Sequence, residues 1–120
     1  MCIRDRKSSE EALCLAYMTA GSMEEAKDIG RMLVKQNLVA CVNLLENMTS
    51  IYKWKEELEE DCEVVMIVKT RKSLMPQLIK TVTKHHSYEC PCILELPIQG
   101  GNTEFLRWVA TETKRTEGSY

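Results

Sequence analysis

VACVNLLENMTSIYKW, KEELEED and CEVVMIVKT follow one another at residues 39–54, 55–61 and 62–70. The first and last segments are rich in β-branched and apolar residues, which favour strands, and the charged middle segment predicts a turn. We therefore expect a long β-hairpin over Val39–Thr70. Its second arm contains the run Val64–Val68, which is apolar on both faces because successive strand side chains point to opposite sides. Both faces of this arm need to be covered.

The flanking residues predict two further strands and three helices. A strand is expected over Leu13–Thr19, followed by a helix that ends near Asn37. Ser22 and Glu25 form a capping box at the start of that helix, in which each side chain bonds a backbone N–H of the other residue. After the hairpin we expect a helix capped by Ser73 and ending at 84–86, a strand over Cys90–Ile98, and a helix over Thr103–Thr113 capped by Asn102. The prolines at 91 and 97 predict that the last strand lies at a sheet edge.

The order strand–helix–strand–strand–helix–strand, with an added C-terminal helix, predicts an α+β ferredoxin-like sandwich with a long central hairpin. Two helices then cover one face of a four-stranded sheet. The opposite face is also apolar, through Leu13–Met18 and Val64–Val68. Because burial of apolar area contributes roughly 25 cal/mol per Å², we expect subunits to associate through this face.

Composition limits the protein class. A chain of 120 residues with 44% hydrophobic residues predicts one domain with a sizeable core. The net charge of −2 and the pI near 5.7 argue against a nucleic-acid partner. The longest apolar runs have the length of strands, so we expect no membrane insertion. Six scattered cysteines and the lack of an apolar leader favour free thiols in a reducing cytoplasm.

The predicted domain boundaries leave short segments at both ends. Residues 1–10 are expected to form a disordered leader, residues 11–114 the domain, and residues 115–120 a flexible tail. The first six residues, MCIRDR, resemble a translated sequencing adaptor, so we interpret them as an artefact and exclude them from the fold. An ordinary disordered terminus is the alternative.

Four motifs closely resemble those of the CutA family, the divalent-cation tolerance proteins. They are ACVN at 40–43, SIYKW at 50–54, EEDCEVVMIVKT at 59–70 and HHSYECP at 85–91. The resemblance extends from about Leu13 to Lys114. It implies a ferredoxin-like subunit assembled into a homotrimer by its hairpins, which would cover the apolar face. It also implies a response to copper and other divalent metal ions, with no established catalytic activity.

Five positions depart from the family pattern. Lys53 stands where the family has an aromatic residue, and Ser87 where it has proline. Glu56 stands where the family has glycine in the hairpin turn, which predicts a longer or differently bent tip because glutamate adopts positive φ poorly. Cys90 and Cys92 replace the valine and glutamate that flank a proline in the family.

These departures bear on metal binding. His85 and His86 match a histidine pair implicated in metal binding in part of the family, and with Cys90 and Cys92 they form a dense set of ligands suited to copper. Met18 could add a thioether. The spacing matches no standard zinc pattern. The alternative is that the histidines complete a helix C-terminus and the cysteines are small strand residues.

A second predicted site is a cleft between subunits that holds a small anion or metabolite. It is formed by six residues at family motif positions: Tyr52, Trp54, Glu63, Lys69, His86 and Tyr88. The alternative is that these aromatic side chains pack the trimer interface and the charges pair across it.

Other proteins of this fold class fit the sequence less well. Met18–Ser22 lacks the Cys-x-x-Cys of ferredoxin-like metal chaperones, and Val64–Val68 lacks the stacking aromatics of an RNA-recognition domain. No glycine-rich phosphate loop supports a nucleotide-binding signalling protein of the PII kind. We therefore predict a cytoplasmic, homotrimeric, non-enzymatic CutA-like protein that binds copper-type ions. A trimeric scaffold or small-ligand signalling protein is the alternative.

Overall fold

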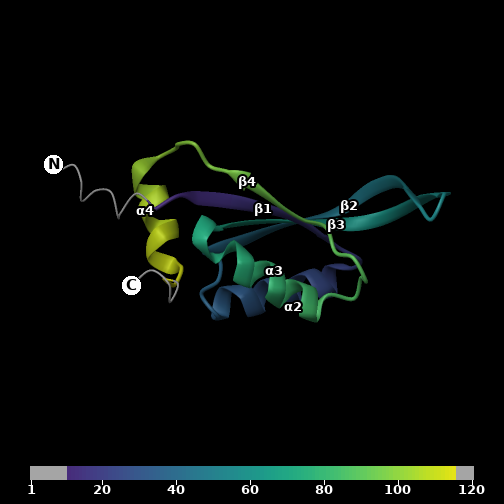
Figure 1. Ribbon diagram of the computed structural model, residues 1–120, viewed down its shortest axis with the longest axis horizontal. Helices are drawn as coiled ribbons and strands as arrows, with labels where there is room; N and C mark the ends of the chain where they lie inside the picture. The colour runs from purple at the N-terminus through teal and green to yellow at the C-terminus, as the bar shows by residue number, and fades with distance from the viewer. Residues whose placement is uncertain (1–10, 116–120) are drawn as a thin grey trace.

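The computed structural model describes residues 11–115, so the predicted leader and most of the predicted tail lie outside the described residues. Figure 1 shows the elements in chain order. They are β1 (Leu13–Ala20), α2 (Met23–Lys35), β2 (Cys41–Trp54), β3 (Glu57–Arg71), the 3₁₀ turn η1 (Lys72–Leu74), α3 (Met75–His85), β4 (Ile93–Pro97) and α4 (Thr103–Glu112). This order confirms the predicted α+β ferredoxin-like fold with an additional C-terminal helix.

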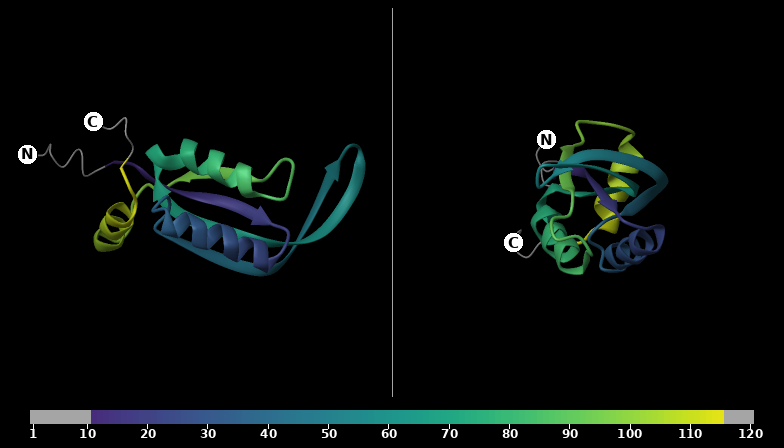
Figure 2. Two further views of the ribbon diagram at one scale, coloured as in Figure 1. Left: turned by 90° about the horizontal axis from the view of Figure 1, so that it is seen from below. Right: turned by 90° about the vertical axis from the view of Figure 1, so that its right-hand side faces the viewer.

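The four strands form one antiparallel sheet in the order β2-β3-β1-β4. β4 lies at an edge, as its prolines predicted. Figure 2 shows α2 and α3 side by side on one face of this sheet. Met18 of β1 is directly opposite Met66 of β3, and both are fully buried beneath the helices with Leu33 and Leu78. Alternate residues of the two central strands therefore supply the floor of the core.

The N-terminus of α2 is capped as predicted by Ser22, whose Oγ accepts a hydrogen bond from the Glu25 N–H at 3.1 Å. The second half of the predicted capping box was wrong. The Glu25 carboxylate accepts from the N–H of Ser87 at 2.8 Å and more weakly from the N–H of Gly21 at 3.4 Å. The segment between α3 and β4 lies close enough to supply a better donor than Ser22 does.

Helix α3 begins differently from the prediction. The preceding η1 turn makes Leu74 the N-cap residue, and no side chain caps the helix. The predicted cap, Ser73, instead donates its hydroxyl proton to Glu11. Pro76 lies in the first turn, where its missing N–H leaves one donor fewer to satisfy.

Strand β4 begins at Ile93, so the predicted start at Cys90 was wrong. Its ladder with β1 begins with Ile93 opposite Met18. The next carbonyl of β1, that of Thr19, lies 2.8 Å from Nε2 of His86 and is therefore not available to β4. Pro91 also lacks an N–H for the ladder. Residues 90–92 consequently form an irregular segment before the strand.

The β2–β3 hairpin reaches beyond the body of the molecule (Figure 1), whose extents are 56 × 24 × 24 Å. The predicted seven-residue turn was too long, because pairing continues to Trp54 opposite Glu57. Only Lys55 and Glu56 form the turn, with φ of 52° and 69°. Two consecutive positive φ angles are typical of a type I′ turn, which matches the twist of the flanking strands. Glu56 therefore adopts the conformation that favours glycine.

Helix α4 is capped as predicted by Asn102, whose Oδ1 accepts the N–H groups of Glu104 and Phe105 at 2.9 and 3.1 Å. The helix is fastened to the sheet by Arg71, which is 6% exposed at the end of β3. Its guanidinium donates to Oγ1 of Thr113 at 3.0 Å, to the Ala110 carbonyl and to the Glu11 carboxylate. One buried side chain thus joins β3 to both ends of the described chain.

Candidate functional site

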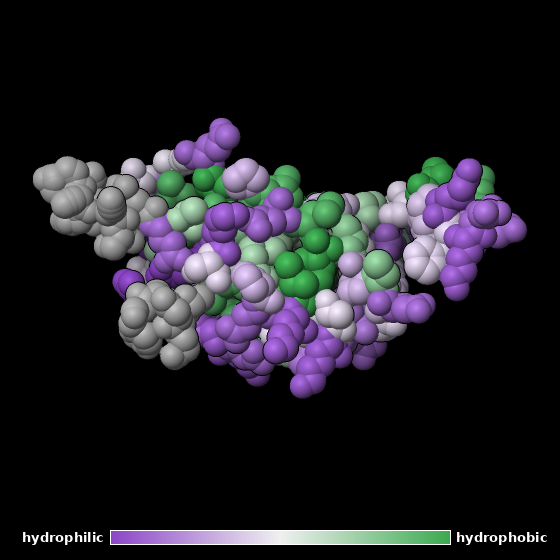
Figure 3. All heavy atoms as spheres, viewed as in Figure 1, coloured by the Kyte–Doolittle hydropathy of each residue, from purple (hydrophilic) through white to green (hydrophobic). Residues whose placement is uncertain are grey.

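The face of the sheet away from α2 and α3 is largely apolar. Leu15 and Tyr17 of β1 are half-buried on it, between β3 and β4. Leu45, Leu94 and Leu96 are 60%, 56% and 42% exposed. Figure 3 shows apolar side chains gathered along the body and again near the end of the hairpin. We call the sheet surface formed by Leu15, Tyr17, Leu45, Leu94 and Leu96 the back face.

A polar cluster joins the hairpin to the segment between α3 and β4. The Glu63 carboxylate of β3 accepts a hydrogen bond from Oγ of Ser50 at 2.7 Å and another from the Tyr88 hydroxyl at 2.7 Å. Burial and the Glu63 hydrogen bond hold the pKa of Tyr88 well above its usual range. The centroid of the Tyr88 ring lies 4.7 Å from the centroid of the His86 ring. Three predicted cleft residues, Glu63, His86 and Tyr88, are therefore brought together.

Both ring nitrogens of His86 are engaged within the chain. The side chain is 1% exposed. Nε2 lies 2.8 Å from the Thr19 carbonyl, and Nδ1 lies 3.0 Å from the backbone N of Tyr88. A carbonyl accepts and an amide donates, so this arrangement places the proton on Nε2 and a lone pair on Nδ1. In this arrangement His86 has no lone pair left for a metal ion.

The other three predicted cleft residues lie along the hairpin. The Tyr52 hydroxyl donates to the Asp61 carboxylate, and this hydrogen bond raises the pKa of Tyr52 to about 12. Trp54 ends β2 beside the turn and is 45% exposed. Lys69 donates to Oδ1 of Asn43 near the other end of the hairpin. A single subunit therefore does not bring all six residues together.

The predicted metal ligands also lie in different environments. Met18 is fully buried in the core. His85 is exposed, and its Nδ1 bonds to the Thr81 carbonyl at 2.9 Å, which leaves Nε2 free. Cys90 is exposed and Cys92 is half-buried. Within residues 11–115 no three His, Cys, Asp or Glu side chains are placed to hold a metal ion.

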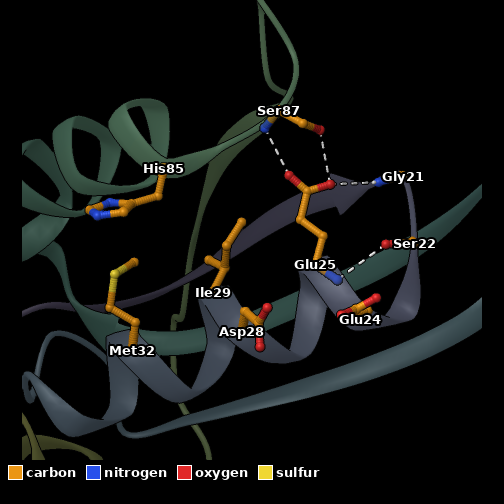
Figure 4. Close-up of a pocket in the computed structure, with 9 residues that line it drawn as sticks. All are labelled: Gly21, Ser22, Glu24, Glu25, Asp28, Ile29, Met32, His85 and Ser87. Carbon is orange, nitrogen blue, oxygen red and sulfur yellow. Dashed lines mark hydrogen bonds between the residues drawn. The ribbon is translucent and has the colours of Figure 1, made fainter.

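An open pocket of about 710 Å³ lies between the start of α2 and the end of α3. Figure 4 shows the Glu25 carboxylate turned toward Ser87 and Gly21, with His85 above Met32. Burial opposes ionisation of Glu25, but the N–H and hydroxyl of Ser87, with weaker help from His86 and Gly21, lower its pKa. Sequence analysis missed this bridging role, because the capping-box pattern explained Glu25 by local contacts alone.

Within residues 11–115, no helix combines the length and the hydropathy required to cross a membrane.

The comparisons with known proteins agree on one family. The family model for the CutA1 divalent ion tolerance protein matches residues 14–112. The chain is 42% identical to mouse (Mus musculus) Protein CutA over 104 residues, which are 87% of this chain and 59% of that protein. It is also 42% identical over 99 residues to the divalent-cation tolerance protein CutA of Thermus thermophilus, covering 82% of this chain and 96% of that protein. The chain thus spans about three-fifths of the mouse relative and nearly all of the bacterial one.

Solved structures show the same similarity. CutA1 from Oryza sativa superimposes with a TM-score of 0.87 at 31% identity, covering 90% of this chain and 99% of that one. The Cut A1 protein of Thermus thermophilus superimposes with a TM-score of 0.83 at 39% identity, covering 85% and 99% of the two chains. Fold, family model and sequence identity agree, and the chain belongs to the CutA1 divalent ion tolerance protein family.

Proposed function

We propose that the protein acts as a homotrimer whose subunits pack through the back face, and that this trimer binds copper-type ions as part of divalent-cation tolerance in the cytoplasm. The trimer is supported mainly by the exposure of Leu45, Leu94 and Leu96, at 42–60%, on the sheet face opposite the one that α2 and α3 cover. Fully burying one leucine contributes about 1.5–3 kcal/mol. Covering all three in an interface therefore stabilises the assembly by several kcal/mol per subunit.

Sedimentation equilibrium of the reduced protein tests the assembly. Wild type is expected to have three times the mass of the chain. Leu96→Asp places a charge on the back face and should yield smaller species, because the carboxylate would be desolvated in the interface. Ile79→Asp on α3 is the matched control, since Ile79 has the same exposure, 42%, on the helical side. A folded wild-type monomer, or equal dissociation of both variants, would contradict a trimer built on this face.

Metal binding is supported by the names of the relatives, which are divalent-cation tolerance proteins, by the exposed side chains of His85 and Cys90, and by the half-buried Cys92. Imidazole suits divalent copper and zinc, and thiolate suits monovalent copper. His86 and Met18 would join these ligands only after breaking their present contacts. Titration of the reduced protein with Cu(I), Cu(II) and Zn(II) tests the proposal. Saturable binding at a fixed stoichiometry supports it, and no binding of any of the three ions rejects it.

A scaffold is the second candidate, favoured by the internal bonding of the polar cluster. The carboxylate of Glu63 and both ring nitrogens of His86 already have partners within the chain. Polar groups that already have hydrogen-bond partners within the chain hold the hairpin in place and are not available to bind a ligand. Thermal-shift assays with small anions distinguish the candidates. A ligand-dependent rise in melting temperature that Glu63→Gln abolishes would favour a small-ligand function over the scaffold.

A further inference from the structure

A second cavity lies at the end of the molecule opposite the hairpin tip. Its volume is about 660 Å³, and it opens between α4 and the residues at the start of β1 and after the end of β4. Figure 1 shows α4 at one end of the elongated molecule and the tip of the β2–β3 hairpin at the other. None of the predicted metal ligands or cleft residues lines this cavity, which we call the α4 cavity.

The deeper part of the α4 cavity is apolar. One of its walls is a single face of α4, whose members recur at intervals of three and four residues: Thr103, Leu106, Arg107, Ala110 and Thr111. The wall opposite includes Leu13 and Ile98, whose backbones are joined by a hydrogen bond of 3.2 Å. Leu13, Ile98, Leu106 and Ala110 are half-buried, whereas the polar lining residues of α4 are exposed. A ligand with an apolar body therefore finds apolar contacts in the depth of the cavity and polar contacts at its mouth.

Positive charge predominates in the lining. Arg71, Arg107 and Arg115 line the cavity, and the only carboxylate among its described lining residues is that of Glu11, which pairs with Arg71. Within residues 11–115, neither Arg107 nor Arg115 forms an ion pair, and both are exposed. The cavity thus holds two uncompensated cations although the net charge of the chain is −2.

Arg71 holds further donors in a fixed place. It is buried, and its guanidinium donates to Oγ1 of Thr113, to the Ala110 carbonyl and to the Glu11 carboxylate. These bonds use three of the five N–H groups that a guanidinium carries. In the part of the chain that the structure describes, the other two N–H groups have no acceptor, although buried donors in native proteins almost always have one. A carboxylate oxygen in the cavity accepts from a guanidinium more strongly than water does.

We infer that the α4 cavity binds a small organic carboxylate with an apolar body, such as a medium-chain fatty acid anion. Arg107 and the remaining donors of Arg71 bind the carboxylate, because the planar guanidinium matches its two oxygens. The hydrocarbon packs on Leu13, Ile98 and Leu106. Cavities of roughly 300–1,000 Å³ with an apolar lining and a few polar groups are typical of small-molecule sites. The inference goes beyond the proposed trimer and metal binding, since it uses none of their residues.

Isothermal titration calorimetry of the full chain with octanoate tests the inference. Wild type is expected to bind one octanoate per chain. Acetate has the charge without the apolar body, and octan-1-ol has the apolar body without the charge. Each should bind at least about tenfold more weakly than octanoate, because burial of the hydrocarbon and the charge-assisted hydrogen bonds both contribute to affinity.

Two variants locate the site. Arg107→Gln removes an exposed cation and leaves the contacts of Arg71 in place, and it should weaken octanoate binding roughly tenfold to a hundredfold, as expected for a lost hydrogen bond to a charged group. Arg31→Gln is the matched control, since Arg31 is an exposed arginine of α2 outside the α4 cavity, and it should retain wild-type affinity. Circular dichroism and sedimentation check that both variants fold and assemble alike. In NMR spectra of wild type, octanoate should shift the amide signals of Leu13, Gly100 and Arg107.

The outcomes separate this inference from the proposed function. Wild-type affinity in Arg107→Gln, or an equal loss in Arg31→Gln, overturns the α4 cavity as the site. Equal affinity for octanoate and octan-1-ol overturns the role of the arginines and the inference with it. A folded wild type that binds no octanoate also overturns it, while the trimer and metal binding stand or fall by their own assays. A loss confined to Arg107→Gln, with amide shifts confined to the lining, supports the inference.

Discussion

His86→Ala should destabilise the protein far more than His85→Ala, although the two histidines are adjacent in the sequence. His86 is 1% exposed on its side chain and bonds to two other backbone positions. His85 is exposed and bonds only to the Thr81 carbonyl of its own helix. The comparison therefore measures the buried contacts of one imidazole against a neighbour of identical chemistry.

The expected difference follows from those contacts. Removing the His86 ring leaves the buried Thr19 carbonyl without a donor, at about 1–3 kcal/mol, and the Tyr88 amide without its acceptor, at about 1 kcal/mol. The vacated ring volume adds a cavity cost. We expect His86→Ala to lower the free energy of unfolding by about 3–4 kcal/mol and His85→Ala by less than about 0.5 kcal/mol. His86→Gln retains a donor toward Thr19 and should lose about half as much.

Urea unfolding followed by circular dichroism measures these changes, at one fixed protein concentration because association shifts apparent stability. The denaturant slopes should agree among the variants. If His85→Ala costs as much as His86→Ala, or if His86→Ala costs less than about 1 kcal/mol, the structural role assigned to the His86 ring is wrong.

Three further predictions concern the turn, one carboxylate and one thiol. Glu56→Gly should raise the free energy of unfolding by about 1 kcal/mol, measured by urea denaturation, because glycine adopts the 69° φ of the tip at no steric cost; a loss of stability would contradict the turn geometry. Glu25→Gln should destabilise the protein at neutral pH. Folding lowers the pKa of Glu25, so the carboxylate contributes to the free energy of unfolding above its ordinary pKa, and this contribution disappears as the pH falls through the lower pKa of the folded state. The melting temperatures of wild type and variant should therefore converge in acid. Cys14 should resist alkylation at pH 8 while Cys62 reacts, because Cys14 is buried and its pKa is about 11; mass spectrometry of digested protein measures both rates.

Much of the architecture was predictable from local pattern. Apolar residues on both parities of Val64–Val68 predicted a central strand, and prolines 91 and 97 predicted the edge position of β4. Caps at Ser22 and Asn102 were also correct, because each depends on donors within three residues. These signals lie within single elements and need no knowledge of the tertiary structure.

What sequence analysis missed depends on contacts between distant residues. The start of β4 is set by His86, which takes the carbonyl of Thr19 that would continue the ladder. The bridging role of Glu25 requires Ser87, 62 residues away. Glu63 and Tyr88 were predicted to share a cleft between subunits, but the hydrogen bond that joins them within one chain, across 25 residues, was not predicted. No periodicity in the sequence reports such pairings, so the partners of these side chains within the chain could not be predicted.

The guanidinium of Arg71 sets the size of the smallest fragment that can fold well. Its partners are Glu11 before β1 and Ala110 and Thr113 at the end of α4. A fragment that begins after Glu11 or stops before Thr113 leaves a buried positive charge partly unpaired, which is among the costliest defects a core can carry. Residues 11–113 are therefore the shortest unit to excise, fuse or permute without loss of stability.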